Sequence, residues 1–345
     1  MPLRKTLLLA LMALVSLSLA LLVLEWLYRL QLVDTYRPEL HTFNPPQVLA
    51  PNAKPTLLVM GDSFTASRTS YAGILQDTLQ EWRMINAAVS GIGVLQALYM
   101  APKRFAQFQP SIFLYQVYVG NDLFDIRYPT NWHTISLGRN VYWFLANHLR
   151  VIGYLNYRLR QVKETLTSRH SHRLSLAGTA VAASAAGDPG AFSVEHYDTR
   201  VKLYVRAEPA LIEDSILVQG NRQHDYGIFL ERLAQLLTYC TPAACRAYIL
   251  VIPHVCQVDA AYLTYMSQLG ARFTTPAALG LPEYPFLVRL RERFTAWPNV
   301  HIVNPLSTLR EVHAQQAVYY ANDEHLSPAG QQEIAVLLRQ QLHLQ

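Results

Sequence analysis

Five short apolar runs, separated by stretches with helical periodicity, constrain the fold of this chain most strongly. The runs are Thr56–Met60, Met84–Ile85, Ser111–Val119, Ala247–Pro253 and Val300–Val303. The helical patterns are Tyr71–Trp82, Gly93–Phe108, Tyr226–Tyr239, Phe286–Trp297 and Ala329–Leu342. Short apolar strands that alternate with helices are typical of a parallel sheet covered on both faces. We therefore predict an α/β fold for most of the chain.

The N-terminus carries an apolar run that is typical of a helix inside a lipid bilayer. No charged residue occurs from Leu7 to Leu24, and a helix of about 20 apolar residues spans the roughly 30 Å of a bilayer core. Arg4 and Lys5 precede the run, and Trp26 and Tyr28 follow it as interfacial aromatics. We predict an uncleaved transmembrane anchor over residues 1–30. A cleaved signal peptide and a buried core helix are the alternatives, and Ser18-Leu19-Ala20 is a poor cleavage site because the apolar run continues through it.

The short tail before the anchor favours a cytoplasmic N-terminus, with the rest of the chain in the periplasm or outside the cell. The basic residues Arg4 and Lys5 against Arg29 and Arg37 are close to a tie and do not decide the orientation. Three cysteines in 345 residues exclude a disulfide scaffold. If this part of the chain lies outside the cytoplasm, Cys240 and Cys245 can form a disulfide; the alternative is that both remain reduced.

Two segments interrupt the strand and helix pattern. Residues 31–55 contain five prolines and predict an extended linker between the anchor and a domain over residues 56–345. The interval between the third and fourth apolar runs is far longer than a crossover needs, so we predict an insertion at about 125–223. It contains an aromatic amphipathic helix over Val141–Val162, interpreted as core or as a lid or membrane-lying cap, and a small-residue segment over Ser175–Gly190 that we expect to be mobile.

The insertion also carries six Lys or Arg residues between Arg150 and Arg173. Such a surface is more often solvated than bound to nucleic acid, and we predict no nucleic-acid partner. Next to an anchor, attraction to anionic lipid headgroups is the better functional interpretation. No compact set of Cys, His and carboxylate residues suggests a metal site, and we predict neither a metal nor a cofactor.

Residues of the types that act in catalysis follow the predicted strands. They are Gly61-Asp62-Ser63, Ser90-Gly91, Gly120-Asn121-Asp122 and, before the last helix, Asp323-Glu324-His325. Open α/β sheets bind ligands at the carboxyl ends of their strands. A serine at such a turn is a nucleophile if a histidine acts as its base and an aspartate orients the histidine. A glycine amide and an asparagine side chain are donors that stabilise an oxyanion.

These blocks resemble those of the SGNH hydrolases, also called GDSL esterases or lipases, in the same order from Gly61 to His325. The resemblance implies a three-layer α/β/α sandwich, with Ser63 as nucleophile, His325 as base, and an oxyanion hole formed by Ser63, Gly91 and Asn121. Two positions depart from the family pattern. Val119 stands where a glycine is usual, and Asn322 stands where the acid of Asp-x-x-His is expected, so we assign the acid to Asp323.

The sequence therefore predicts a membrane-anchored serine esterase that acts on carboxylic esters of a small molecule, lipid or glycan. An O-acyltransferase that moves an acyl group onto a surface polysaccharide would use the same residues, because only the acceptor differs. A catalytically inactive envelope binding or assembly protein is the alternative from another class. No motif identifies the substrate.

Overall fold

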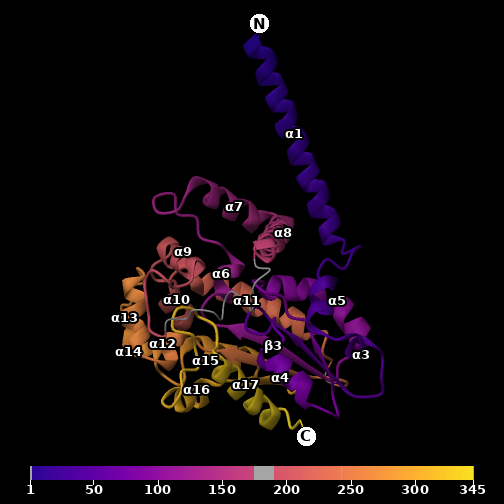
Figure 1. Ribbon diagram of the computed structural model, residues 1–345, viewed down its shortest axis with the longest axis vertical. Helices are drawn as coiled ribbons and strands as arrows, with labels where there is room; N and C mark the ends of the chain where they lie inside the picture. The colour runs from indigo at the N-terminus through magenta and orange to yellow at the C-terminus, as the bar shows by residue number, and fades with distance from the viewer. Residues whose placement is uncertain (1, 175–189, 242, 345) are drawn as a thin grey trace. The chain divides into compact units, whose positions relative to one another are not determined.

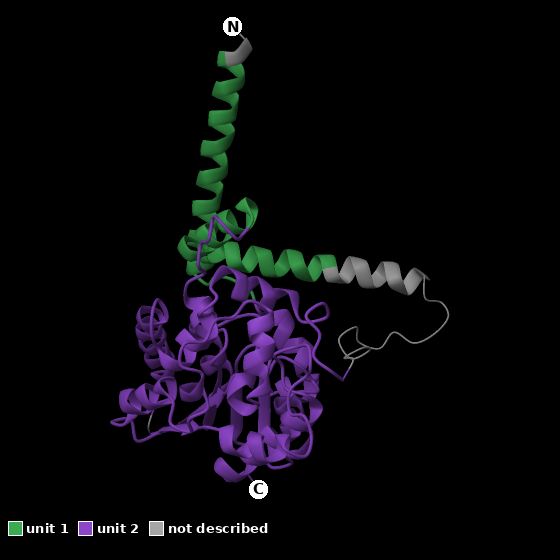
Figure 2. Ribbon diagram, turned by 90° about the vertical axis from the view of Figure 1, so that its left-hand side faces the viewer, with its two compact units in different colours: residues 1–35, 136–181 green, residues 36–135, 182–345 purple. Residues whose placement is uncertain are grey.

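The computed structural model describes residues 2–174, 190–241 and 243–344, so the predicted mobile segment Ser175–Gly190 lies outside the described residues except for Gly190. The chain forms two compact units (Figure 2). Unit 1 comprises residues 1–35 and 136–181, and unit 2 comprises residues 36–135 and 182–345.

Unit 2 is built on a five-stranded sheet with the order β2-β1-β3-β4-β5, in which every pairing is parallel. Its strands are β1 Thr56–Met60, β2 Arg83–Asn86, β3 Ile112–Tyr118, β4 Arg246–Ile252 and β5 Val300–Val303. Every residue of β1, β2 and β3 is buried, and β1 and β3 are apolar on both faces apart from Thr56 and Gln116. All five strands coincide with the predicted runs to within a residue or two.

Helices cover both faces of the sheet (Figure 1). The helices of unit 2 include α4 Tyr71–Thr78, α5 Val94–Phe108, α11 Arg222–Leu237, α15 Pro285–Phe294, α16 Leu306–His313 and α17 Pro328–Gln341. Helix α5 packs against α11, whereas α4 and α16 pack against α17. The predicted α/β/α sandwich is therefore confirmed.

The predicted linker is partly helical. Unit 2 begins at Tyr36 and includes α2 (Arg37–Phe43) and α3 (Pro46–Leu49), each with a proline in its first turn. Asn44 is buried, donates to the carbonyl of Asn86 (2.7 Å) and accepts from its amide (2.8 Å), which fastens this segment to β2. The expectation of an extended spacer over residues 31–55 was wrong because these prolines begin helices instead of preventing them.

The predicted insertion divides between the two units. Unit 1 contains α7 (Leu137–His148) and α8 (Arg150–Leu174), together with α1 (Pro2–Arg29). The single helix predicted over Val141–Val162 is thus two helices with a break at Leu149. The later part of the insertion returns to unit 2, whose remaining helices are α6 Asp122–Ile126, α9 Thr199–Ala207, α10 Leu211–Leu217, α12 Val255–Val258, α13 Ala261–Gln268 and α14 Pro276–Leu279.

Helix α1 is long and apolar enough over Arg4–Arg29 to cross a membrane. None of its most apolar window is buried, so the alternative of a buried core helix is wrong. A signal sequence near an N-terminus would have the same properties.

Two of the three cysteines form a disulfide. Cys240 and Cys245 are joined between α11 and β4, and the side chain of Asn299 donates to the carbonyls of both residues (2.9 and 3.3 Å). Cys256 is free and buried.

Candidate active site

The turn after β1 presents Ser63 in a fixed conformation. The side-chain oxygen of Gln116 on β3 accepts from the Asp62 amide (3.0 Å) and from the Thr65 hydroxyl (3.1 Å). A Cβ at Gly61 would lie 2.5 Å from that oxygen, which is why glycine is required there. The Asp62 carboxylate in turn accepts from the Phe64 amide (2.9 Å). The backbone on both sides of Ser63 is therefore held by buried hydrogen bonds.

A second set of contacts holds His325 next to this turn. Tyr319 and Leu326 form an antiparallel bridge, and the hydroxyl of Ser327 caps α17 by accepting from the Gly330 amide (3.3 Å). The side chain of Gln331 then accepts from the Tyr71 amide (2.7 Å) and donates to the carbonyl of Phe64 (3.2 Å). The start of α17 is thus tied directly to the serine turn, although the two are far apart in the sequence.

Ser63, His325 and Asp323 form a hydrogen-bonded chain. His325 Nε2 lies 2.7 Å from Ser63 Oγ, and His325 Nδ1 lies 2.5 Å from Asp323 Oδ1. Because a carboxylate only accepts, Nδ1 carries the proton and the lone pair of Nε2 faces the serine hydroxyl. Asp323 also accepts from the His325 amide (3.1 Å), which fixes the short Asp-x-His turn.

Asn322, which stands where the acid of Asp-x-x-His is expected, makes its hydrogen bonds with a different segment of the chain. Its side chain accepts from the Ser193 amide (2.6 Å) and donates to the carbonyl of Ala191 (3.0 Å), and its carbonyl accepts from the Asp198 amide (2.9 Å). Asn322 therefore holds the segment before α9 against the histidine loop.

Gly91 and Asn121 lie on the loops that follow β2 and β3, the two strands on either side of β1. The Val89 amide donates to the carbonyl of Gly61 (3.0 Å), which joins the glycine loop to the serine turn. Gly91 has a φ of 73°, a conformation that favours glycine. Within the described residues, no hydrogen bond uses the amides of Ser63 or Gly91. The oxygen of the Asn121 side chain is buried and has no hydrogen-bond partner in the described part of the chain.

The departure at Val119 has a local reason. Val119 is wholly buried, and its amide donates to the carbonyl of Ile252 (3.1 Å). The glycine is instead needed at position 120, where a Cβ would lie 2.4 Å from the ring of Tyr118.

Two residues that the sequence analysis did not single out contact the imidazole or its neighbours. The ring of Phe64 lies between His325 (4.9 Å between centroids) and Tyr118 (4.4 Å). The hydroxyl of Tyr118 donates to the carboxylate of Glu324 (3.1 Å). Phe64 directly follows the serine and Glu324 is the middle residue of Asp-x-His, but only the folded structure reveals these contacts.

The site is strongly acidic and buried. Burial raises the pKa of Asp62 to about 6 and, together with the charge of Asp62, raises the pKa of Asp125 to about 7. Burial also raises the pKa of Glu324 to about 7. Arg200 on α9 supplies positive charge to this cluster and to Asp323. It was not predicted because α9 lies in the supposed insertion.

His325 responds to both burial and charge. Burial alone would lower its pKa, but the hydrogen bond and charge of Asp323, with the charges of Glu324 and Asp62, outweigh burial and raise the pKa of His325 above its ordinary value. Burial opposes the ionisation of Asp323, yet its hydrogen bond to His325 and the positive charges nearby lower the Asp323 pKa. Both shifts favour an imidazolium paired with a carboxylate.

The buried carboxyl of Asp125 predicts a measurable stability effect. Its pKa is about 7 in the folded chain and near 3.9 when unfolded, so between these values the folded chain holds a proton that the unfolded chain releases. Stability therefore falls as pH rises from about 4 to 7. We expect Asp125→Asn to raise the unfolding free energy at pH 8 by on the order of 1 kcal/mol and therefore to raise the melting temperature. The variant should also show a flatter dependence of stability on pH. Asp77→Asn on the exposed side of α4 is the control. A lower melting temperature for Asp125→Asn at pH 8 would contradict the expected penalty.

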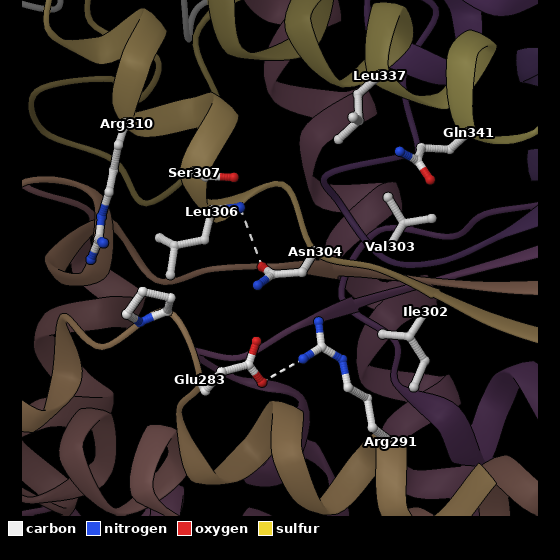
Figure 3. A pocket seen from close by; sticks show the side chains of 11 residues that line it. Glu283, Arg291, Ile302, Val303, Asn304, Leu306, Ser307, Arg310, Leu337 and Gln341 are labelled. Carbon is white, nitrogen blue, oxygen red and sulfur yellow. Dashed lines mark hydrogen bonds and ion pairs between the residues drawn. The ribbon is translucent and has the colours of Figure 1, made fainter. Parts of the chain in front are cut away.

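A pocket of about 350 Å³ lies apart from these residues, at the β5 edge of the sheet (Figure 3). Side chains from β5, α15, α16 and α17 line it, and none of them belongs to the Ser63–His325–Asp323 chain. Arg291 is paired with Glu283, and Arg310 donates to the carbonyls of Gln257 (2.8 Å) and Gly280 (2.7 Å). Because its cationic groups are already engaged, we assign no ligand to this pocket.

No protein-family model matches the chain, and no curated protein matches it. It is similar to the solved structure of TesA, with 13% identity, a TM-score of 0.39, and coverage of 83% of this chain and 97% of that chain. It is also similar to a catalytic mutant of Axe2, an acetylxylan esterase from Geobacillus stearothermophilus (12% identity, TM-score 0.41, covering 86% and 97%). A third similar structure is a protein from Streptococcus pneumonia named for platelet activating factor (14%, 0.42, covering 96% and 98%). At these identities and TM-scores the similarity identifies neither an activity nor a substrate.

Proposed function

We propose that this chain is a serine ester hydrolase of the SGNH type, in which Ser63, His325 and Asp323 form the catalytic triad. The observation that carries the proposal is the pair of hydrogen bonds at His325, 2.7 Å to Ser63 Oγ and 2.5 Å to Asp323. A triad is recognised by this geometry and by the roles it permits.

In the proposed reaction, Ser63 Oγ attacks the ester carbonyl and passes its proton to His325 Nε2. Asp323 stabilises the imidazolium that results, and the amides of Ser63 and Gly91 with the side chain of Asn121 donate to the oxyanion. Collapse of the tetrahedral intermediate releases the alcohol, which takes the proton from His325, and leaves an acyl group on Ser63. Water, deprotonated by His325, then releases the acid and restores the serine.

We further propose that α1 anchors the chain and that unit 2 lies outside the cytoplasm. The Cys240–Cys245 disulfide supports this placement, because disulfides persist in oxidising compartments and are rare in the cytosol. A cytoplasmic N-terminus with α1 as a single span is the simplest topology that satisfies both features. Protease protection of the N-terminal tail in sealed inside-out and right-side-out vesicles tests it.

The test of the reaction is ester turnover by the purified full-length chain in detergent, on acetyl esters and on esters of longer acyl chains. Acid released into water in the absence of any other acceptor supports hydrolysis. If acyl groups appear instead on an added sugar, and acid release is negligible without the sugar, the chain is an acyltransferase. Absence of both products with an intact fold would indicate an inactive binding protein.

The carboxylate of Glu324 provides a pH test of the site. His325 must be neutral to accept the serine proton, so kcat/KM falls as pH drops through the raised pKa of His325. The charge of Glu324 contributes to that raised pKa, and the other charged groups around it are Asp323, Asp198 and Arg200. We therefore expect Glu324→Gln to move the acid limb of kcat/KM to lower pH.

The matched control for this change is Glu311→Gln, at an exposed position on α16. It should leave the pH profile unchanged. If Glu324→Gln lowers the rate equally at every pH, the carboxylate supports only the packing of Tyr118 and its charge does not act on His325.

A further inference from the structure

Helices α7 and α8 form one compact unit with α1 (Figure 2). Glu25, in the last turns of α1, is buried and accepts from the Val151 amide in the first turn of α8 (2.8 Å). Its other carboxylate oxygen accepts from Arg29 (2.5 Å). The rings of Tyr28 and Tyr154 lie 5.5 Å apart. The first turn of α8 is therefore held at the point where α1 ends.

This attachment sets the level of α8 relative to any membrane that α1 spans. Glu25 lies four residues before the end of α1, which is about 6 Å along a helix. The described part of α8 runs crosswise to α1 in Figure 2, and in Figure 1 it is seen nearly end-on beside a vertical α1. A helix attached crosswise at the end of a span lies near the membrane surface.

Helix α7 has an apolar face that is exposed among the described residues. Leu137, Val141 and Phe144 follow one another at spacings of four and three residues and are 70%, 43% and 51% exposed. Asn140 and Trp143, on the adjoining side of the helix, are buried. The sequence suggested that this segment is either core or a membrane-lying cap. The structure has both features, because Trp143 lies in the core and Phe144 on the surface.

Helix α7 and the first half of α8, up to Lys163, are basic. Residues 137–163 contain five Lys or Arg residues and no Asp or Glu, whereas the net charge of the entire chain is +5. An amphipathic helix with an apolar face and basic flanks binds in the interface of a membrane, most strongly when the headgroups are anionic.

We infer that α7 and the first turns of α8 form a membrane-surface contact, with Leu137, Val141 and Phe144 among the headgroups of the membrane that α1 crosses. The partner is an anionic phospholipid surface. The inference rests on the proposed role of α1 as a span and is independent of the proposed ester chemistry. The contact would set the distance of the insertion from the bilayer, in place of a flexible tether.

The experiment uses the full-length chain, one copy per lipid nanodisc, with a fluorophore on a cysteine introduced at one of three exposed positions. Phe144→Cys tests the face, Leu14→Cys tests α1, and Val336→Cys on α17 of unit 2 is the control. Nitroxide-labelled lipid quenches only fluorophores within the bilayer or its headgroup layer. We expect quenching of most of the fluorescence at positions 14 and 144 and little at 336, with stronger quenching at 144 in phosphatidylglycerol than in phosphatidylcholine.

Each other result overturns a defined part of the inference. If position 14 is quenched and position 144 behaves like 336, the surface contact is wrong and the anchor stands. If position 14 is not quenched, α1 does not span and the contact has no basis. Equal quenching at 144 in the two lipids removes the preference for anionic headgroups. If position 144 is unquenched by lipid yet becomes shielded from aqueous iodide only in discs with two chains, the face binds a second copy instead.

Discussion

Replacing Ser63 with alanine is expected to reduce ester turnover by on the order of 10⁴ to 10⁶-fold, the range found when the nucleophile of a serine triad is lost. The hydroxyl of Ser63 lies 2.7 Å from His325 Nε2, and no acyl-enzyme forms without it. His325→Ala should cost about as much, because the serine then keeps its proton. The double variant should be no slower than either single variant, since the two residues act in one step.

The control for these variants is a serine in a similar position outside the triad. Ser67 lies four residues after Ser63 and contacts the hydroxyl of Thr69 (2.9 Å). Ser67→Ala should leave turnover within a few-fold of the unmodified chain, on the scale of a surface substitution. Ester cleavage by Ser63→Ala at the unmodified rate would refute the proposed mechanism.

The second large effect separates Asp323 from its neighbour Asn322. Asp323 is 2.5 Å from His325 Nδ1, and in the proposed mechanism it stabilises the imidazolium that forms in the transition state. An amide in its place cannot supply that charge and favours the wrong tautomer of the histidine. We expect Asp323→Asn to reduce kcat by up to about 10⁴-fold while the protein remains folded.

Asn322→Ala should instead affect stability more than kcat. It removes the hydrogen bonds to Ser193 and Ala191, so it should lower the free energy of unfolding by about 1–3 kcal/mol and reduce kcat only slightly. Melting curves and kcat measured on both variants separate the two roles. If Asn322→Ala loses more kcat than Asp323→Asn at a temperature where both are folded, the acid is not Asp323.

The centre of the sheet could be predicted from the sequence because β1 and β3 are buried on both faces. A run such as Thr56–Met60 has no polar residue after its first position, and the turn residues that follow it mark the carboxyl end of a strand. The break between α7 and α8 could not be predicted in this way. No glycine or proline marks the break between Leu145 and Val151. The Val151 amide at the start of α8 donates to Glu25, from a helix more than a hundred residues earlier.

Some residues of the candidate site could be predicted from the sequence and others could not. Ser63 and His325 stand at strand or helix boundaries in recognisable blocks, and Asp323 follows from the short distance to the histidine in the sequence. Arg200 and Tyr118 gain their roles only from tertiary contacts, Arg200 by facing the acidic cluster and Tyr118 by donating to Glu324. The linker was misjudged because Pro38 and Pro46 favour both an extended chain and the first turn of a helix.

The most direct test of the central claim is the site of covalent labelling by a fluorophosphonate, which reacts with an activated serine. Intact-mass analysis of the full-length chain, followed by peptide mapping, should show one adduct, on Ser63, and none in the Ser63→Ala or His325→Ala variants. An adduct on a different serine, or undiminished labelling of His325→Ala, would contradict the assignment of Ser63 and His325 as nucleophile and base.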